Sequence, residues 1–172
     1  ERQPISLDAI RRIQRECMTM DDENRRLLAL ISDTGLRLSE AVGLAKDDIM
    51  LDAPTPYINL QPHSWRRLKT KSSERLVPLI GASLWASERL MQNDNSLAFP
   101  SYCNGKTCNA NSASAALNKW LKQVAGPNYV ILSFRHSMRD RLPAINCPSD
   151  MIDQIGGRSS GKIGEGYGKV SR

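Results

Sequence analysis

Arginine and lysine residues gather in three short segments of the chain. The 172 residues include 24 Lys and Arg against 18 Asp and Glu, which gives a net charge of +6. The three segments contain Arg11, Arg12 and Arg15; Arg66, Arg67, Lys69, Lys71 and Arg75; and Arg135, Arg139 and Arg141. Such clusters favour a polyanionic partner. Because short basic runs are also typical of ordinary solvated surfaces, charge alone leaves both interpretations open.

A second unusual segment lies close to the last residue. The stretch IGGRSSGKIGEGYG, residues 155–168, holds six of the eleven glycines and one tyrosine, Tyr167. Glycine allows backbone conformations and close approaches that other residues do not. Two interpretations follow: the segment is a frayed surface tail with a stray aromatic residue, or it is a loop that brings a functional tyrosine to a ligand.

Cysteine and histidine show no pattern of a metal site. The four cysteines, Cys17, Cys103, Cys108 and Cys147, lack the paired short spacing of zinc ligands, and the only histidines are His63 and His136. We therefore expect neither a metal nor another cofactor. No apolar run approaches the length of a membrane span and no signal peptide opens the chain. We expect free thiols in a reducing cytoplasm and no membrane partner.

Hydrophobic periodicity predicts a mostly helical α+β domain with one small antiparallel sheet. A helix within residues 4–17 is capped by Ser6, and a second within 21–35 is stopped by Gly35. Further helices are predicted at about 38–44, 82–92, 112–124, 133–142 and 149–157. Strands are predicted at 57–62 and in a hairpin over 66–79 that turns at Lys71, Ser72 and Ser73.

The order of several motifs resembles the catalytic domain of the tyrosine recombinases, or phage-type integrases. These motifs are TGLRLSEAVGL, LKTKSSERLVPL, SFRH, a GG pair and GEGYG. Each is weak alone, but together they are specific and they cover nearly the whole chain. The resemblance implies the fold of that domain, with a small β-sheet and hairpin packed on helices. We expect residues 1–172 to be a single catalytic domain, a fragment that lacks the upstream DNA-clamping domain.

The resemblance also implies a reaction. Members of the family cut a DNA strand with a tyrosine, form a 3′-phosphotyrosine and rejoin the strand without metal or ATP. Such chemistry needs a nucleophile, donors for the phosphate charge and an acid for the leaving oxygen. Tyr167 matches the nucleophile, and Arg37 and Arg135 match the two arginines. A guanidinium group stays charged and holds two phosphate oxygens in a fixed fork.

Lysine and glutamate complete the set that the resemblance implies. Lys69 is our choice for the hairpin lysine that donates a proton to the 5′-oxygen, and Lys71 is the alternative. Glu40 matches the family's acidic position, and we interpret it as orienting an arginine. Further residues are expected to contact DNA, namely Arg66, Arg67, Lys71, Arg75 and Lys162.

Some positions depart from the family pattern. Leu132 stands where a histidine is usual, three residues before the second arginine, and Arg158 stands where histidine or tryptophan is usual. Arg158 still offers hydrogen bonds to a phosphate, so it stays among the catalytic candidates. His136 matches a second family histidine, which we interpret as structural. Pro143 falls inside a predicted helix, which it should bend or end.

The expected function is a site-specific DNA recombinase or integrase that acts on double-stranded DNA. We expect a tetramer of the chain on DNA and a monomer when isolated, in the cytoplasm of a bacterium that carries a prophage or another mobile element. The departures keep an alternative open, a degenerate DNA-binding module of the same fold with weak or no strand transfer. A type IB topoisomerase uses similar residues and is a further alternative.

Overall fold

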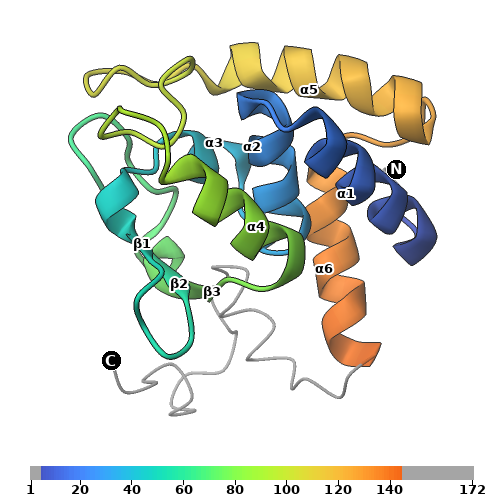
Figure 1. The fold of residues 1–172 in the computed structure, drawn as a ribbon, viewed down its shortest axis with the longest axis horizontal. Coiled ribbons are helices and arrows are strands. Elements are labelled where there is room, and N and C mark those ends of the chain that lie inside the picture. The colour runs from blue at the N-terminus through green and yellow to red at the C-terminus, as the bar shows by residue number, and fades with distance from the viewer. Residues whose placement is uncertain (1–4, 145–172) are drawn as a thin grey trace.

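The computed structural model describes residues 5–144 of the chain as a helical fold with one small sheet (Figure 1). The helices are α1 (Leu7–Met20), α2 (Glu23–Ser32), α3 (Leu38–Val42), α4 (Gly81–Leu90), α5 (Ala110–Ala125) and α6 (Leu132–Ala144). The strands are β1 (Ile49–Met50), β2 (Tyr57–Leu60) and β3 (Arg75–Pro78), and two 3₁₀ turns span Lys46–Asp48 and Lys71–Ser73. None of the described helices is long and apolar enough to cross a membrane.

Helix α2 is the centre of the fold (Figure 1). The other five helices all contact it, and every residue from Leu27 to Ser32 is fully buried. A helix that is covered on all sides needs apolar or small residues around its whole circumference, as the sequence LLALIS provides. Its start is fixed by Asp22, whose side chain accepts a hydrogen bond from the backbone N–H of Arg25 at 2.9 Å.

The predicted ends of the first two helices are confirmed. The Ser6 hydroxyl accepts a hydrogen bond from the backbone N–H of Ala9 at 3.2 Å and caps α1. After α2, Gly35 adopts a left-handed conformation with φ of +68°, and a Cβ atom there would meet the Met138 side chain at 3.1 Å. The chain therefore turns sharply at Gly35 and delivers Arg37 to the start of α3.

The sheet differs from the predicted hairpin over 66–79. Only Arg75–Pro78 forms a strand in this segment, and it pairs with β2 in an antiparallel sheet of order β1-β2-β3. Residues 61–74 form a long loop that is closed by a bridge between His63 and Arg66 and by the 3₁₀ turn Lys71–Ser73. The prediction was wrong because the polar run 66–74 has no apolar partner strand beside it. The two-residue strand β1 is too short for a periodic signal.

Helix α6 is continuous from Leu132 to Ala144, so Pro143 lies in its last described turn. Because the described residues stop at Ala144, one residue after Pro143, the expectation that this proline bends or ends the helix stays a prediction. A proline removes the hydrogen bond to the residue four positions earlier, so only the final turn is affected. Phe134, which is fully buried, and Arg135 lie two turns before it. The predicted helix over 149–157 lies outside the described residues.

Candidate active site

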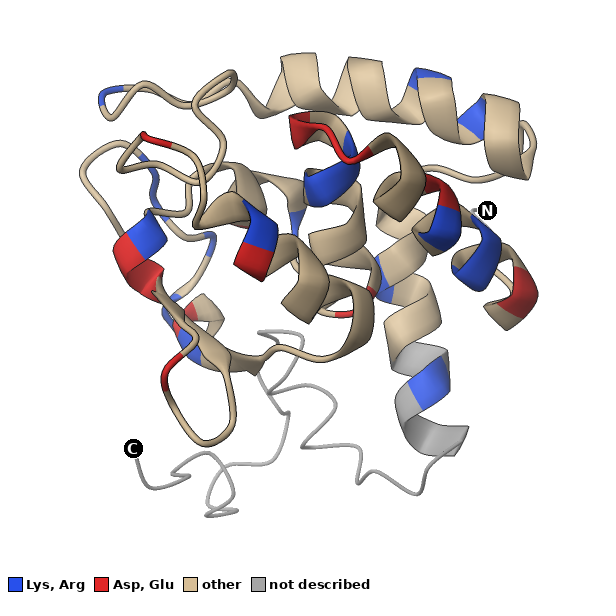
Figure 2. Cartoon of the chain, in the orientation of Figure 1, with Lys and Arg blue, Asp and Glu red and all other residues tan. Residues whose placement is uncertain are grey.

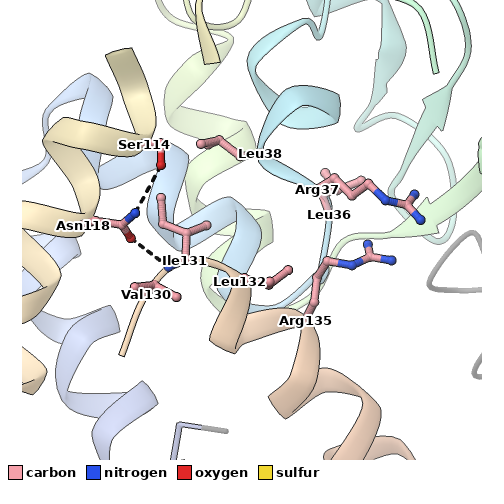
Figure 3. Close-up of a pocket in the computed structure, with 9 residues that line it drawn as sticks. All are labelled: Leu36, Arg37, Leu38, Ser114, Asn118, Val130, Ile131, Leu132 and Arg135. Atoms are coloured by element: carbon pink, nitrogen blue, oxygen red, sulfur yellow. Dashed lines mark hydrogen bonds between the residues drawn. The ribbon is translucent and has the colours of Figure 1, made fainter. Parts of the chain in front are cut away.

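The two arginines that the sequence singles out line one pocket (Figure 3). Arg37 comes from the turn after α2 and Arg135 from α6, and in Figure 3 both guanidinium groups point the same way. Leu132 lines the same pocket, and it is 44% exposed to solvent. The lining residues are Leu36, Arg37, Leu38, Ser114, Asn118, Val130, Ile131, Leu132 and Arg135. Folding therefore joins residues that are far apart in the sequence.

Arg37 is held at the start of α3 by Glu40. The backbone N–H of Arg37 donates to Glu40 Oε1 at 2.8 Å, and its Nη1 donates to Oε2 at 3.1 Å. Nη1 also lies 3.4 Å from Ser73 Oγ, to which it donates a hydrogen bond. The side chain is 23% exposed, so Arg37 is anchored on one side and reaches solvent on the other.

The Glu40 carboxylate is almost inaccessible to water and forms an ion pair with a second arginine, Arg75. Its side chain is 2% exposed, and Arg75 donates to both carboxylate oxygens at 3.1 Å. Burial alone would raise the pKa of Glu40, but the hydrogen bonds and charges of Arg75 and Arg37 outweigh burial and hold that pKa below its ordinary value. A buried carboxylate is tolerated in this way only when cations and donors surround it.

This pairing gives Arg75 a partner inside the protein, while the expected contact of Arg75 with DNA stays a prediction. The Arg75 side chain is 4% exposed, and its Nη1 also donates to the backbone oxygen of Ser73 at 2.6 Å. Its charge is used inside the protein, on the carboxylate of Glu40.

Arg135 is attached to the same turn as Arg37. It is 6% exposed, and its Nη1 donates to the backbone oxygen of Gly35 at 2.7 Å. Gly35 lies two residues before Arg37, so one turn of the backbone supports both arginines. His136, the next residue of α6, is partly exposed and does not line the pocket.

Asn118 is a site residue that the sequence analysis missed. Its Oδ1 accepts a hydrogen bond from the backbone N–H of Ile131 at 2.9 Å, and its Nδ2 donates to Ser114 Oγ at 3.1 Å (Figure 3). The contact ties α5 to the turn that begins α6. One feature of the sequence could have indicated this role: Asn118 is a polar residue next to Leu117, on a helix whose buried residues are apolar.

The two candidate lysines lie in the loop between β2 and β3. Lys69 and Lys71 are both exposed. The end of this loop is fixed because Ser73 is fully buried and its Oγ contacts both Arg37 and Thr70, the latter at 3.1 Å. The loop therefore carries its lysines beside the Arg37 side of the site.

The start of the same loop is held by a buried polar cluster. Asp48, which is fully buried, accepts hydrogen bonds from Gln61 at 2.9 Å and from the backbone N–H of Ala45 at 2.9 Å. Its Oδ2 also lies 2.8 Å from His63 Nε2. The His63 ring stacks on Trp65 with centroids 4.3 Å apart. The loop is thus fixed at both ends, and its exposed part lies between them.

Arg66 also departs from the expected DNA-contacting set. It is 6% exposed, and its Nη1 donates to the backbone oxygen of Gln61 at 2.6 Å. It packs so closely on Gly43 that a Cβ atom there would lie 2.6 Å from Arg66 Nε. Burial lowers the pKa of Arg66. The side chain therefore supports the loop, whereas the neighbouring Arg67 is exposed.

Basic residues are spread over several elements of the described part of the chain. Figure 2 shows Lys and Arg on α1, on α5 and along the loop before β3. Arg141 is engaged by Asp33 at 3.2 Å and by the backbone oxygen of Ser32 at 2.6 Å. The expected site residues Tyr167, Arg158 and Lys162 lie outside the described residues.

Comparison with known proteins identifies both the family and the fold. A sequence model described as the phage integrase family matches residues 5–171. No curated protein sequence matches the chain significantly. Similar solved structures include the XerA recombinase, with a TM-score of 0.68 and 17% identity over 92% of this chain and 55% of that chain.

Two further similar structures are described as complexes with DNA. The Tn1549 transposon integrase with transposon right end DNA has a TM-score of 0.64 and 18% identity, over 91% of this chain and 58% of that chain. The other is the XerH site-specific recombinase bound to palindromic difH substrate, described as a post-cleavage complex. It has a TM-score of 0.62 and 16% identity, over 92% of this chain and 47% of that chain.

The chain therefore spans about half the length of the similar solved proteins. At these identities the likeness shows the fold, which is that of a tyrosine-recombinase catalytic domain, as the sequence predicted. The match of the family's sequence model to nearly every residue shows the membership: the chain belongs to the phage integrase family.

Proposed function

We propose that this chain is the catalytic domain of a site-specific DNA recombinase that cuts and rejoins double-stranded DNA through a 3′-phosphotyrosine. The observation that carries the proposal is the pocket in which Arg37 and Arg135 meet, both supported by one backbone turn. Two of the similar structures hold DNA. A bacterial mobile element such as a prophage is the proposed source, and a tetramer on DNA the proposed assembly.

The arginine pair suits the phosphate of the cleaved bond. As that phosphate is attacked, negative charge gathers on its non-bridging oxygens, and guanidinium groups donate to these oxygens in a fixed fork. Among the described residues, the hydrogen bonds of Arg37 use its backbone N–H and Nη1. Its Nε and Nη2 take part in none of them. The N–H groups at Nε and Nη2 of Arg37 can therefore donate hydrogen bonds to an anion that binds in the pocket.

Tyrosine and lysine supply the remaining steps of the proposed reaction. The Tyr167 oxygen attacks phosphorus, the bond to the 5′-oxygen breaks, and that oxygen takes a proton from Lys69 or Lys71. A phenol has a pKa of about 10, so nearby arginine cations must favour its ionised form during attack. Rejoining is the reverse, with the 5′-hydroxyl of another strand as nucleophile. The bond energy stays in the protein–DNA ester, so no metal or ATP is needed.

One feature of the pocket departs from the family pattern, although the family match and the similar structures do not favour the alternative of a DNA-binding module without strand transfer. Leu132 borders the pocket with an exposed apolar side chain where the family has a donor. A chain that lacks this donor and transfers no strands would be a DNA-binding module of the same fold. Incubation with a nicked duplex separates the two functions, because only a recombinase becomes covalently attached to it.

Duplex DNA binding should depend steeply on salt. Several contacts from exposed cations such as Arg67, Lys69 and Lys71 release counterions, so the association constant should fall by roughly 10² or more between low and moderate salt. Fluorescence anisotropy with a labelled duplex across a salt titration measures this. Arg67→Ala should weaken binding and reduce the slope, whereas Arg66→Ala should leave the slope unchanged. A flat titration would contradict a DNA partner.

Covalent attachment should require Tyr167. We expect an adduct between the chain and a nicked duplex that forms without divalent metal and survives a denaturing gel. Tyr167→Phe should abolish this adduct while leaving DNA affinity nearly unchanged, because only the nucleophilic oxygen is removed. Arg37→Ala and Arg135→Ala should remove it too. Attachment that persists in Tyr167→Phe, or that needs magnesium, would refute the assigned nucleophile.

Restoring a histidine at residue 132 should speed up cleavage. The loss of one hydrogen-bond donor to the phosphate lowers the rate by a factor on the order of 10² to 10³. Leu132 lines the pocket and is exposed, so a histidine side chain fits there without a steric clash. Leu132→His should recover part of this loss in single-turnover adduct formation, and Leu132→Ala is the matched control that adds no donor. An equal rate for both variants would mean that residue 132 does not occupy the histidine's place.

A further inference from the structure

The arrangement around Glu40 gives Arg75 a task in the proposed reaction. Among the described residues, one carboxylate is shared by two arginines, so these three side chains together carry one net positive charge. Arg75 makes the two-point contact, at 3.1 Å to each oxygen, whereas the Arg37 side chain makes a one-point contact. The more buried arginine therefore takes the larger share of the carboxylate.

The two arginines also differ in what surrounds them. Arg75 is 4% exposed and is further tied to the Ser73 backbone oxygen, whereas Arg37 is 23% exposed and borders the pocket. Without Arg75, Arg37 would be the one arginine among the described residues that contacts the buried Glu40 carboxylate directly. The Glu40–Arg37 pair would then be neutral, and the carboxylate would draw the guanidinium away from an incoming phosphate.

We propose that Arg75 is a positioning residue that holds Glu40 in a two-point ion pair and so keeps the charge of Arg37 available to the phosphate. The proposal rests on the function proposed above. It assigns Arg75 no contact with DNA. Its effect passes through Glu40 and Arg37.

The test is a pair of variants with opposite predicted effects. Arg75→Gln should slow single-turnover adduct formation on a nicked duplex by on the order of 10- to 100-fold, because Glu40 then neutralises Arg37. Glu40→Gln/Arg75→Gln removes both opposite charges and should be at least about tenfold faster than Arg75→Gln alone. A purely structural role predicts no such rescue, since the second substitution removes further contacts.

Controls separate the rate from stability. Arg26→Gln breaks a different ion pair, in which Arg26 Nε lies 2.8 Å from the carboxylate of Asp21 between α1 and α2. This variant should lower the melting temperature without changing the rate. All rates are taken well below the melting temperature of each variant. A double variant as slow as Arg75→Gln, with both folded, would overturn the proposal.

A binding measurement decides the matter without catalysis. Arg37→Ala should weaken duplex binding in the otherwise unchanged chain, but by clearly less in the Arg75→Gln background, where Arg37 is already neutralised. Equal losses in both backgrounds would overturn the positioning role. If the unchanged chain binds DNA but forms no adduct, the proposed recombinase function fails, and this binding cycle still tests Arg75.

Two cysteines, Cys103 and Cys108, lie opposite each other in the segment between α4 and α5. Residues 102–109 fold back on themselves: the backbone N–H of Asn109 donates to the Tyr102 oxygen at 2.7 Å, and that of Asn104 donates to the Thr107 oxygen at 3.2 Å. Cys103 and Cys108 face each other between these two hydrogen bonds. Such a pair has Cα atoms about 4.5 Å apart, within the range that a disulfide spans.

Their surroundings set how fast a thiol exchange could be. Both cysteines are free thiols, and Cys108 is partly exposed. The charge of Arg66 acts on both sulfurs, while Arg66 Nε and Nη2 are buried without a hydrogen-bond partner among the described residues. This cation favours the thiolate, although burial raises the pKa of Cys108 to about 12. Exchange should therefore be slow at neutral pH.

We propose that Cys103 and Cys108 form a modification site at which a low-molecular-weight disulfide links the two sulfurs. The Cys108 thiolate attacks one sulfur of the small disulfide and releases the first small thiolate. The Cys103 sulfur then gives up its proton, attacks the Cys108 sulfur and releases the second. The protein loses two protons and two electrons, and the small disulfide takes them up and becomes two thiols.

Oxidised glutathione at mildly alkaline pH tests this site. The reduced chain should lose two hydrogens in its mass, and peptide mapping should join Cys103 to Cys108. Closing so short a loop should raise the melting temperature by roughly 4 to 8 °C. Cys103→Ser should stop at a glutathione adduct on Cys108. An unchanged mass, or a link to Cys17 or Cys147 instead, would overturn the proposal.

Discussion

The buried carboxylate of Glu40 is the constraint on which the site depends. A carboxylate with 2% of its side chain exposed is strongly unfavourable unless cations and N–H donors compensate for the lost water. Glu40 takes its compensation from three directions: the backbone of its own helix start, Arg37 beside it, and Arg75 from β3. Satisfying one charge thus fixes α3, the sheet and the end of the long loop relative to one another.

The number of basic residues is a poor guide to which of them are exposed, because several are paired or buried inside the protein. Arg75 neutralises a carboxylate, Arg66 supports a loop from within, and Arg141 pairs with Asp33. The sequence counts all three as ordinary basic residues. Only burial distinguishes them from Arg67, and burial depends on contacts between segments that no local pattern reveals.

Local signals predicted the helices well. The predicted cap at Ser6 and the predicted turn at Gly35 involve side chains and backbone within a few residues, so their chemistry is visible in the sequence. The segment 66–79 was predicted wrongly because strand pairing is not local: β3 needs β2, and the residues before it are held by Asp48, His63 and Ser73.

The candidate site was predicted in part for a similar reason. Arg37, Glu40 and Arg135 lie in motifs that can be read directly, and the fold brings them together. Asn118 and Arg75 act through hydrogen bonds to distant partners, Ile131 and Glu40. Because neither belongs to a motif with its partner, their roles become visible only in three dimensions.

The turn from Thr34 to Arg37 connects Arg37 and Arg135 to the same short piece of backbone. The Thr34 hydroxyl donates to the Leu30 oxygen at 2.7 Å and accepts from the N–H of Leu36 at 3.3 Å, so the turn is fixed on the buried helix α2. Gly35 gives its oxygen to Arg135, and Arg37 follows two residues later. A shift of the turn would move the anchors of both guanidinium groups together. Their separation is therefore set by the buried helix α2, and this rigid support is the preorganisation that the proposed binding of one phosphate by two arginines requires.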